Sequence, residues 1–197
     1  FLDYHMVPGL FMPNGCMACS GALLNWIART FAGAESAAAA AAGESPHQHL
    51  DRLAESVPPG ADGLILLPYF LGEKTPIHDP YARGTLVGLG LHHTIGHIWR
   101  AALEGVVFGF RHHVAVFEGV RRVGASDGGV ESRVWMQIAA DVLGHPIELL
   151  AGHPGSCLGA AYVAGVAAGG FAGWDEIARY VHPAGMVAPN PASADRY

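Results

Sequence analysis

Long apolar runs, cysteine and basic residues are all scarce in this sequence. It contains no stretch of about 18 consecutive apolar residues, the length that a membrane-spanning helix needs. Its three cysteines are too few, and odd in number, for a disulfide framework. Lysine and arginine number 11 against 17 aspartates and glutamates, which gives a net charge of −6. We therefore expect no membrane segment, no disulfide scaffold and no nucleic-acid partner, because nucleic-acid binders normally carry a basic surface.

The chain does have enough apolar sequence for a core. Of its 197 residues, 51% are hydrophobic and 14% are charged, a balance that is typical of a folded domain and not of a disordered segment. This length suits one domain, so we expect residues 1–197 to form a single one. The first residue is Phe1 and not methionine, and we interpret the chain as part of a longer protein.

Two pairs of residues have the spacing of metal ligands. Cys16 and Cys19 form a lone CxxC, and His93 and His97 are four residues apart, so they can share a helix face. A structural zinc ion needs four ligands, and no HExxH pattern accompanies the histidines. We therefore expect no metal site here, and we favour solvated or helix-capping histidines.

Apolar periodicity predicts strands that alternate with helices. Two short extended pieces around Pro8 and Gly9 open the chain, and residues 34–42, which are mostly alanine, are either a helix extension or a spacer. The expected helices cover residues 21–31, 46–57, 95–118, 132–143, 155–170 and 174–181. The expected strands cover residues 64–70, 84–91, 121–126 and 146–150, and a proline-rich tail follows the last helix. This alternation indicates an α/β layer fold in which the four strands share one sheet.

Charged pairs occur on the long predicted helix and in the loop before it. Arg100 and Glu104 have the four-residue spacing of a helical ion pair. In the segment "GEKTPIHDPYARG", Asp79 and Arg83 can either clamp a phosphate or tie the loop together, and we favour the structural role. The neighbouring pair 73–74, a glutamate and a lysine, is left open as a possible lining of a cleft.

The segment "ASDGGVESRVWMQIAADVLGHPI", residues 125–147, has the elements of an anion site. Glycines let backbone N–H groups approach phosphate oxygens closely, and a helix N-terminus adds unpaired N–H groups and partial positive charge. The segment has neither the GxGxxG order of a dinucleotide fold nor the GK[ST] of a P-loop. From the residues alone, a nucleotide-binding loop and a purely structural turn remain equal alternatives.

Four ordered segments resemble the C-terminal domain of the FGGY carbohydrate kinases, over about residues 1–170. "GTLVGLGLHHTIGHIWRAALE", Gly84 to Glu104, fits the second signature of that family. "LPYFLGEKTPIHDPYARG" resembles the proline-rich loop before it, "DGGVESRVWMQIAADVLGHPI" the glycine-rich segment after it, and "CLGAAYVAGVAAGGF" the helix that follows. The resemblance implies the actin, Hsp70 and sugar-kinase fold (ribonuclease H-like), an α/β domain with a mixed sheet flanked by helices.

The resemblance also implies a set of nucleotide-binding residues. In family members the glycine loop holds ATP, which gives this role to Gly128, Gly129 and Ser132. Asp127 takes the place of the first of three glycines usual in xylulokinase-like members, although glycerol kinases have a similar Asp-Gly-Gly. The segment "SGALLNW" is similar to a Gly-x-x-x-Gln-Trp of glycerol kinases whose glycine and glutamine contact the nucleotide. Gly21 and Asn25 occupy those two places, and without the family they would be interpreted as ordinary helix residues.

By resemblance, the chain is the ATP-binding C-terminal part of a cytoplasmic kinase that uses ATP/ADP and Mg²⁺. The motifs are most similar to those of xylulokinase-like enzymes, which phosphorylate a pentulose; a ribulokinase-like or glycerol kinase-like enzyme and a non-catalytic nucleotide-binding module are the alternatives. In the family the sugar site lies in the N-terminal half and the catalytic aspartate near the domain junction. We therefore expect the N-terminal half as a partner, and we assign no catalytic residue in this chain. We expect no sugar phosphorylation by this chain alone. Whether the protein forms a homodimer is left open.

Overall fold

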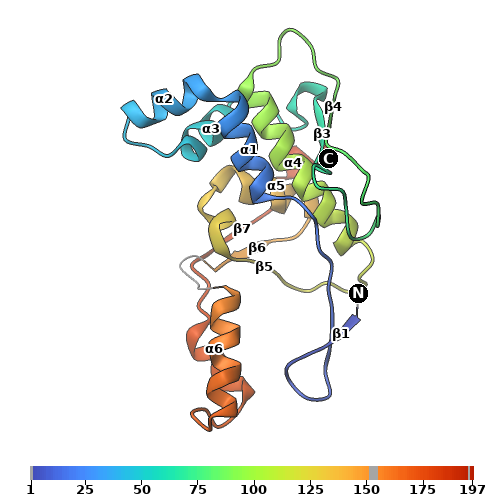
Figure 1. Ribbon diagram of the computed structural model, residues 1–197, viewed down its shortest axis with the longest axis vertical. Helices are drawn as coiled ribbons and strands as arrows, with labels where there is room; N and C mark the ends of the chain where they lie inside the picture. Colours follow the sequence, from blue (N-terminus) through green and yellow to red (C-terminus); the bar gives the residue numbers. More distant parts are fainter. Residues whose placement is uncertain (1, 151–154, 195) are drawn as a thin grey trace.

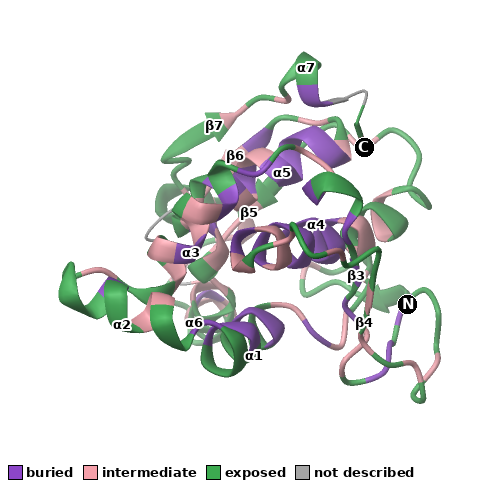
Figure 2. Ribbon diagram, turned by 90° about the horizontal axis from the view of Figure 1, so that it is seen from above, coloured by how far each residue is buried: buried purple, intermediate pink, exposed green. Residues whose placement is uncertain are grey.

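Helix α4 (Ile95–Val114) lies at the centre of the computed structural model (Figure 1), which describes residues 2–150, 155–194 and 196–197. Every residue from 99 to 107 is buried, so the helix is enclosed on all sides over more than two turns. Its neighbours are α1 (Gly21–Phe31), α3 (Pro46–Glu55), α5 (Arg133–Leu143) and a strand. Figure 2 shows that burial is concentrated on α4 and α5.

The remaining helices are all shorter than α4. They are α2 (Gly33–Ala41), α6 (Ser156–Ala167), α7 (Pro191–Ala194) and three 3₁₀ helices, η1 (Ala61–Gly63), η2 (Asp127–Glu131) and η3 (Trp174–Tyr180). The alanine-rich segment is therefore a helix of its own. Residues 174–181 were expected to be α-helical, but residues 174–180 form the 3₁₀ helix η3. Helix α6 extends away from the other helices (Figure 1).

The strands form three separate small sheets, so the prediction of one shared sheet is wrong. An antiparallel hairpin joins β1 (Leu2–Tyr4) to β2 (Phe11–Pro13), as the two extended pieces predicted. The strands expected at 64–70 and 84–91 shorten to β3 (Ile65–Leu67) and β4 (Thr85–Val87), which pair only with each other. The third sheet contains β5 (Val123–Ala125), β6 (Ile147–Leu149) and β7 (Gly185–Val187), with β5 parallel and β7 antiparallel to β6.

The packed helices explain why the sheets are separate. Strand β3 packs against α4, whereas β6 and β7 pack against α5, and α4 and α5 pack against each other. The two helices therefore lie between β3–β4 and the three-stranded sheet, and backbone hydrogen bonds cannot join the two. The proline-rich tail is also more ordered than expected, because it supplies β7 and α7.

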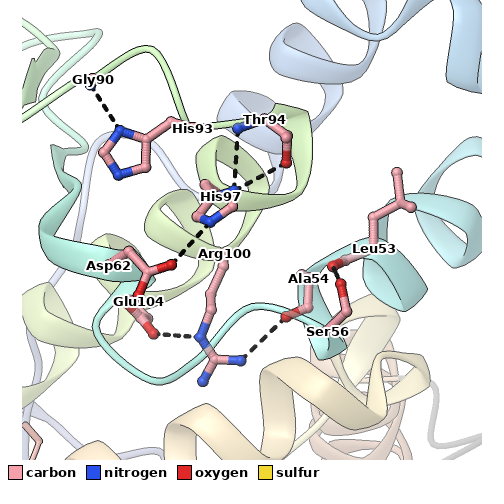
Figure 3. A network of polar contacts seen from close by, with 10 residues as sticks. All are labelled: Leu53, Ala54, Ser56, Asp62, Gly90, His93, Thr94, His97, Arg100 and Glu104. Atoms are coloured by element: carbon pink, nitrogen blue, oxygen red, sulfur yellow. Dashed lines mark hydrogen bonds and ion pairs between the residues drawn. The ribbon is translucent and has the colours of Figure 1, made fainter.

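A buried ion pair holds distant parts of the chain to α4 (Figure 3). Arg100 and Glu104 are only 6% and 2% exposed. Glu104 Oε1 accepts hydrogen bonds from Arg100 Nε (2.8 Å), from the backbone N–H of Gly60 (3.0 Å) and from the Tyr197 hydroxyl (2.6 Å). Arg100 also donates to the carbonyl of Ala54 and to Tyr197. Burial, followed by the hydrogen bond to Glu104, raises the pKa of the Tyr197 phenol well above its ordinary value.

Two histidines at the start of α4 accept backbone N–H groups there, and one of them caps the helix. Nδ1 of His97 accepts the backbone N–H of Thr94 (3.1 Å) in a capping box, and its Nε2 lies 3.2 Å from Asp62 Oδ2 (Figure 3). Nδ1 of His93 accepts the N–H of Gly90 (2.8 Å). Within the described ranges no group of three or more His, Cys, Asp or Glu side chains is arranged to hold a metal ion. His97 therefore caps the helix, one of the two roles favoured from the sequence, whereas His93 stabilises the turn before it.

None of the helices in the described part of the chain combines the length and the apolar character that a membrane span requires.

Candidate functional site

The predicted glycine loop follows the carboxyl end of β5 and leads into α5. Residues 127–131 form the 3₁₀ helix η2, a turn that was not predicted from the sequence. Ser132 then caps α5, because its Oγ accepts a hydrogen bond from the backbone N–H of Trp135 at 3.1 Å. The loop therefore has the arrangement of an anion site, a strand end followed by a helix N-terminus.

Gly128 is a glycine that the fold itself does not require. A Cβ built on it would meet no atom within 4 Å, and its φ lies outside the left-handed region that favours glycine. Gly129 is more restricted, since a Cβ there would lie 3.4 Å from the ring of Trp135. The backbone at Gly128 is exposed and has free space in front of it, so a ligand can approach it closely.

Asp127 stands where the backbone favours glycine. Its φ is +66°, in the left-handed region, a backbone conformation that glycine adopts more readily than other residues. Aspartate tolerates that conformation better than most residues. One carboxylate oxygen, Oδ2, accepts a hydrogen bond from Ser126 Oγ at 3.0 Å. The other, Oδ1, would lie 2.2 Å from a Cβ on Gly155, so the carboxylate lies against that glycine.

Gly21 and Asn25 lie on the exposed side of α1, one turn apart, as their spacing predicts. Ser20 occupies the N-cap position, but its side chain makes no capping hydrogen bond. Gly21 resembles Gly128, because a Cβ on it would also meet no atom within 4 Å and its φ is also outside the left-handed region. The structure brings Asp127, Gly128, Gly129 and Ser132 together in one loop. The pair on α1 belongs to a different element, which packs against α4.

Comparisons with known proteins fit this domain. The sequence model of the C-terminal domain of the FGGY family of carbohydrate kinases matches residues 2–168. The chain belongs to this family. It is 34% identical to the gluconokinase of Bacillus licheniformis over 200 residues, which cover 99% of the chain and 38% of that protein. It is 30% identical to a xylulose kinase of Bacillus subtilis, over 95% of the chain and 36% of that kinase.

A solved structure resembles the chain over nearly its whole length. The xylulose kinase from Rhodospirillum rubrum is 50% identical, with a TM-score of 0.81 over 99% of the chain and 38% of the other protein. The solved structures that resemble this chain are sugar kinases of the actin and Hsp70 type, so the fold class predicted from the sequence is confirmed. The chain spans less than two fifths of the length of these relatives.

The proline-rich loop of this FGGY domain is held together by its own charged residues. Asp79 Oδ1 accepts the backbone N–H groups of Tyr81 (2.8 Å) and Ala82 (3.2 Å). Arg83 donates to the carbonyl oxygens of Pro80 and Ala82. The structural role favoured for Asp79 and Arg83 is therefore confirmed, although each bonds to the loop backbone and not to the other side chain.

The CxxC segment is tied to the same loop. Glu73 is buried and accepts the backbone N–H of Ala18 at 3.1 Å and that of Lys74 at 2.7 Å. Cys16 is exposed, whereas Cys19 is buried, and that burial raises the pKa of the Cys19 thiol. Glu73 therefore holds two segments together, and no metal-binding arrangement among the described residues includes these cysteines.

A cavity of about 890 Å³ borders the glycine loop of the FGGY domain without containing it. It lies between α5, residues 55–59 and β7, and meets the loop region at Val130 and Arg133. None of the six predicted nucleotide-binding residues lines it. This cavity was not predicted from the sequence, because its walls come from segments that are far apart in the chain.

Proposed function

We propose that this FGGY domain binds ATP and ADP through the glycine loop and the first turn of α1. The nucleotide-binding set is Gly21, Asn25, Asp127, Gly128, Gly129 and Ser132. The observation that carries the proposal is the free space at Gly128. This free space follows directly on the carboxyl end of β5, so a ligand bound there can approach the backbone closely.

The position of the loop supports the same assignment. In α/β folds, ligands bind beyond the carboxyl ends of parallel strands, and β5 and β6 are parallel neighbours. The N-terminal end of α5 adds the partial positive charge that favours a phosphate. Gly21, at the N-terminal end of α1, is the second glycine of the set with free space around it.

Mg²⁺ enters the proposal together with the nucleotide. In phosphoryl transfer the ion bridges phosphate oxygens and is held by few protein ligands. The described residues contain no group of three or more metal-ligating side chains. Among these residues we assign no metal ligand, and the proposed ion would be bound together with the nucleotide phosphates.

The whole protein is proposed to be a carbohydrate kinase that moves the γ-phosphate of ATP to a sugar hydroxyl in the cytoplasm. The carboxylate base and the sugar site are expected in an N-terminal half that forms the other side of the nucleotide cleft. A pentulose such as xylulose is the proposed substrate, supported by the 50% identity to the xylulose kinase from Rhodospirillum rubrum. Gluconate and glycerol are the alternatives, because gluconokinases and glycerol kinases are also similar to the chain.

The substrate is tested by an ADP-release assay of the full-length protein on xylulose, ribulose, gluconate and glycerol. Turnover that depends on xylulose supports the proposal, and a preference for another sugar replaces it. Binding of ADP without turnover on any sugar would favour a non-catalytic nucleotide-binding module. The 197-residue chain alone is expected to give no sugar-dependent turnover.

The nucleotide site is tested by calorimetric titration of ADP into the full-length protein and two variants. Gly128→Val places a branched side chain in the free space and should lower the affinity for ADP more than about tenfold, a loss of about 1.4 kcal/mol or more. Gly33→Val is the matched control, because Gly33 also lies in the first turn of a helix, has no atom within 4 Å of a built Cβ and has an ordinary φ. If Gly128→Val binds ADP as tightly as the parent, the loop is only a structural turn.

A further inference from the structure

An acidic residue beside a phosphate-binding loop raises an electrostatic problem. A carboxylate near phosphate oxygens repels them, and the repulsion is stronger where water is excluded. Asp127 directly precedes Gly128 and Gly129, so its charge has to be directed elsewhere if the loop binds a nucleotide. The contacts of its side chain show where that charge lies.

The carboxylate of Asp127 lies against Gly155, beyond the edge of the sheet at which β5 and β6 end. Strands β5 and β6 are parallel, with Ala125 opposite Leu149, so the segments that follow them start side by side. After β5 comes the glycine loop, and after β6 the chain reaches Gly155, the N-cap residue of α6. Asp127 Oδ1 and Oδ2 would lie 2.2 and 3.0 Å from a Cβ on Gly155.

Gly155 is suited to this close approach. It has a φ of +56°, which favours glycine, and any side chain there would collide with the carboxylate. Because Gly155 precedes the first turn of α6, the carboxylate lies near the N-terminal end of a 12-residue helix. That end carries partial positive charge and stabilises an acid. Ser126 Oγ holds the second carboxylate oxygen.

We propose that Asp127 is a positioning residue, which fastens the glycine loop to the start of α6 and so orients Gly128 and Gly129 toward the nucleotide. Its carboxylate is held by Ser126 and by the N-terminal end of α6, which turns its charge away from the phosphates. This inference rests on the proposed nucleotide site and adds the element that fixes its loop. It also gives Gly155 a role, that of leaving room for the carboxylate.

A double-mutant cycle on Asp127 and Gly155 tests the proposal, with ADP affinity measured by calorimetry on the full-length protein. Gly155→Ala should lower the affinity about tenfold, because the added methyl group displaces the carboxylate and the loop with it. Asp127→Gly should lower it only about threefold, since the fastening is lost but the backbone strain is relieved. In the Asp127→Gly background the backbone strain at Gly155 remains but the collision with the carboxylate is gone, so Gly155→Ala should cost less ADP affinity than it does in the parent, and the difference between the two costs is the coupling.

Asp127→Asn provides the conservative variant. Asparagine tolerates a positive φ and keeps an oxygen that can accept from Ser126, so its affinity for ADP should stay within about twofold of the parent. Asp127→Ala keeps the strained backbone and loses the contacts, and its affinity should fall further than that of Asp127→Gly. Thermal unfolding of each variant, without ADP, confirms that it is folded.

Three results would overturn the proposal. If the changes at Asp127 and Gly155 act independently in a protein that binds ADP, the two residues are not coupled and only this inference fails. If variants at Asp127 lower the affinity for ADP but not that for 2′,3′-dideoxy-ADP, Asp127 binds the ribose directly and is not a positioning residue. If the parent protein binds no ADP, the proposed nucleotide site fails and this inference fails with it.

Discussion

The middle of α4 and the loop after β5 both contain glycine, but the surroundings of the two glycines are opposite. A Cβ on Gly105, in α4, would lie 2.2 Å from the carbonyl oxygen of Leu66 in β3. A Cβ on Gly128 would touch nothing. In α4 the glycine allows a strand to pack directly on a helix, whereas in the loop packing gives no reason for it.

The charged residues of the two regions differ in the same way. Glu104 in α4 is enclosed, and its carboxylate is shared by Arg100, Gly60 and Tyr197. Asp127 in the loop is exposed and contacts only its neighbour Ser126 and the turn at Gly155 among the contacts described above. Glu104 and Gly105 in α4 are thus fixed by the packing around them, whereas Asp127 and Gly128 in the loop are exposed and make few packing contacts. A change at α4 should therefore affect stability, and a change in the loop should affect binding.

The largest effect is expected from Glu104→Ala. The substitution leaves the buried Arg100 guanidinium without its carboxylate, and it removes the acceptor for Gly60 and Tyr197. Loss of one partner of a buried ion pair typically costs about 3–5 kcal/mol, and we expect a loss in that range in urea unfolding. Glu148→Ala is the control, because the Arg122 side chain that pairs with Glu148 is 64% exposed and such pairs contribute about 0–1 kcal/mol. Similar losses in both variants would contradict the comparison.

A smaller effect is expected from alanine at Gly105, and almost none from alanine at Gly128. In Gly105→Ala the methyl group meets the Leu66 carbonyl, so α4 and β3 must move apart, at a cost of about 1–3 kcal/mol. In Gly128→Ala the methyl group enters free space, and the free energy of unfolding should change by less than about 0.5 kcal/mol. Denaturant unfolding of the two variants measures the difference. A destabilised Gly128→Ala protein would show that the loop is a structural turn.

Local signals in the sequence located the helices well. The predicted 21–31 helix is α1, and the predicted 132–143 helix differs from α5 by one residue. Both ends of α5 have local causes, the Ser132 cap at its start and Gly144 with a φ of +66° at its end. Such causes act over a few residues, so a pattern in the sequence can reveal them.

Long-range pairings were not visible in the sequence. The three-residue strand β7 has no alternating pattern and exists because it pairs with β6, far earlier in the chain. The four-residue spacing of Arg100 and Glu104 does not distinguish an exposed ion pair from a buried one. This pair also bonds to Gly60 and Tyr197, which are far from it in the sequence. The division into three sheets depends likewise on how α4 packs against α5.

The candidate site was predicted mainly by family resemblance. The sequence alone left a nucleotide loop and a structural turn as equal alternatives, because both contain glycines before a helix. The free space at Gly128 and the positive φ at Asp127 are properties of the folded chain. The contact between Asp127 and Gly155 links the glycine loop to the start of α6, two segments that are far apart in the sequence.

Among the changes that should lower stability, Ser132→Ala is expected to have the smallest effect. Ser132 lies between the two regions, because it caps α5, which packs on α4. The variant loses the hydrogen bond from the Trp135 N–H to Ser132 Oγ, and loss of such a cap costs about 1 kcal/mol. Ser45→Ala is the matched control, since Ser45 Oγ caps α3 by accepting the Gln48 N–H at 3.2 Å. Both variants should lose about the same free energy of unfolding, measured in denaturant. Only Ser132→Ala should also lower the affinity for ADP measured by calorimetry, because α3 is not part of the proposed site. If ADP affinity is unchanged in Ser132→Ala, Ser132 is a cap alone and the proposed site loses that residue.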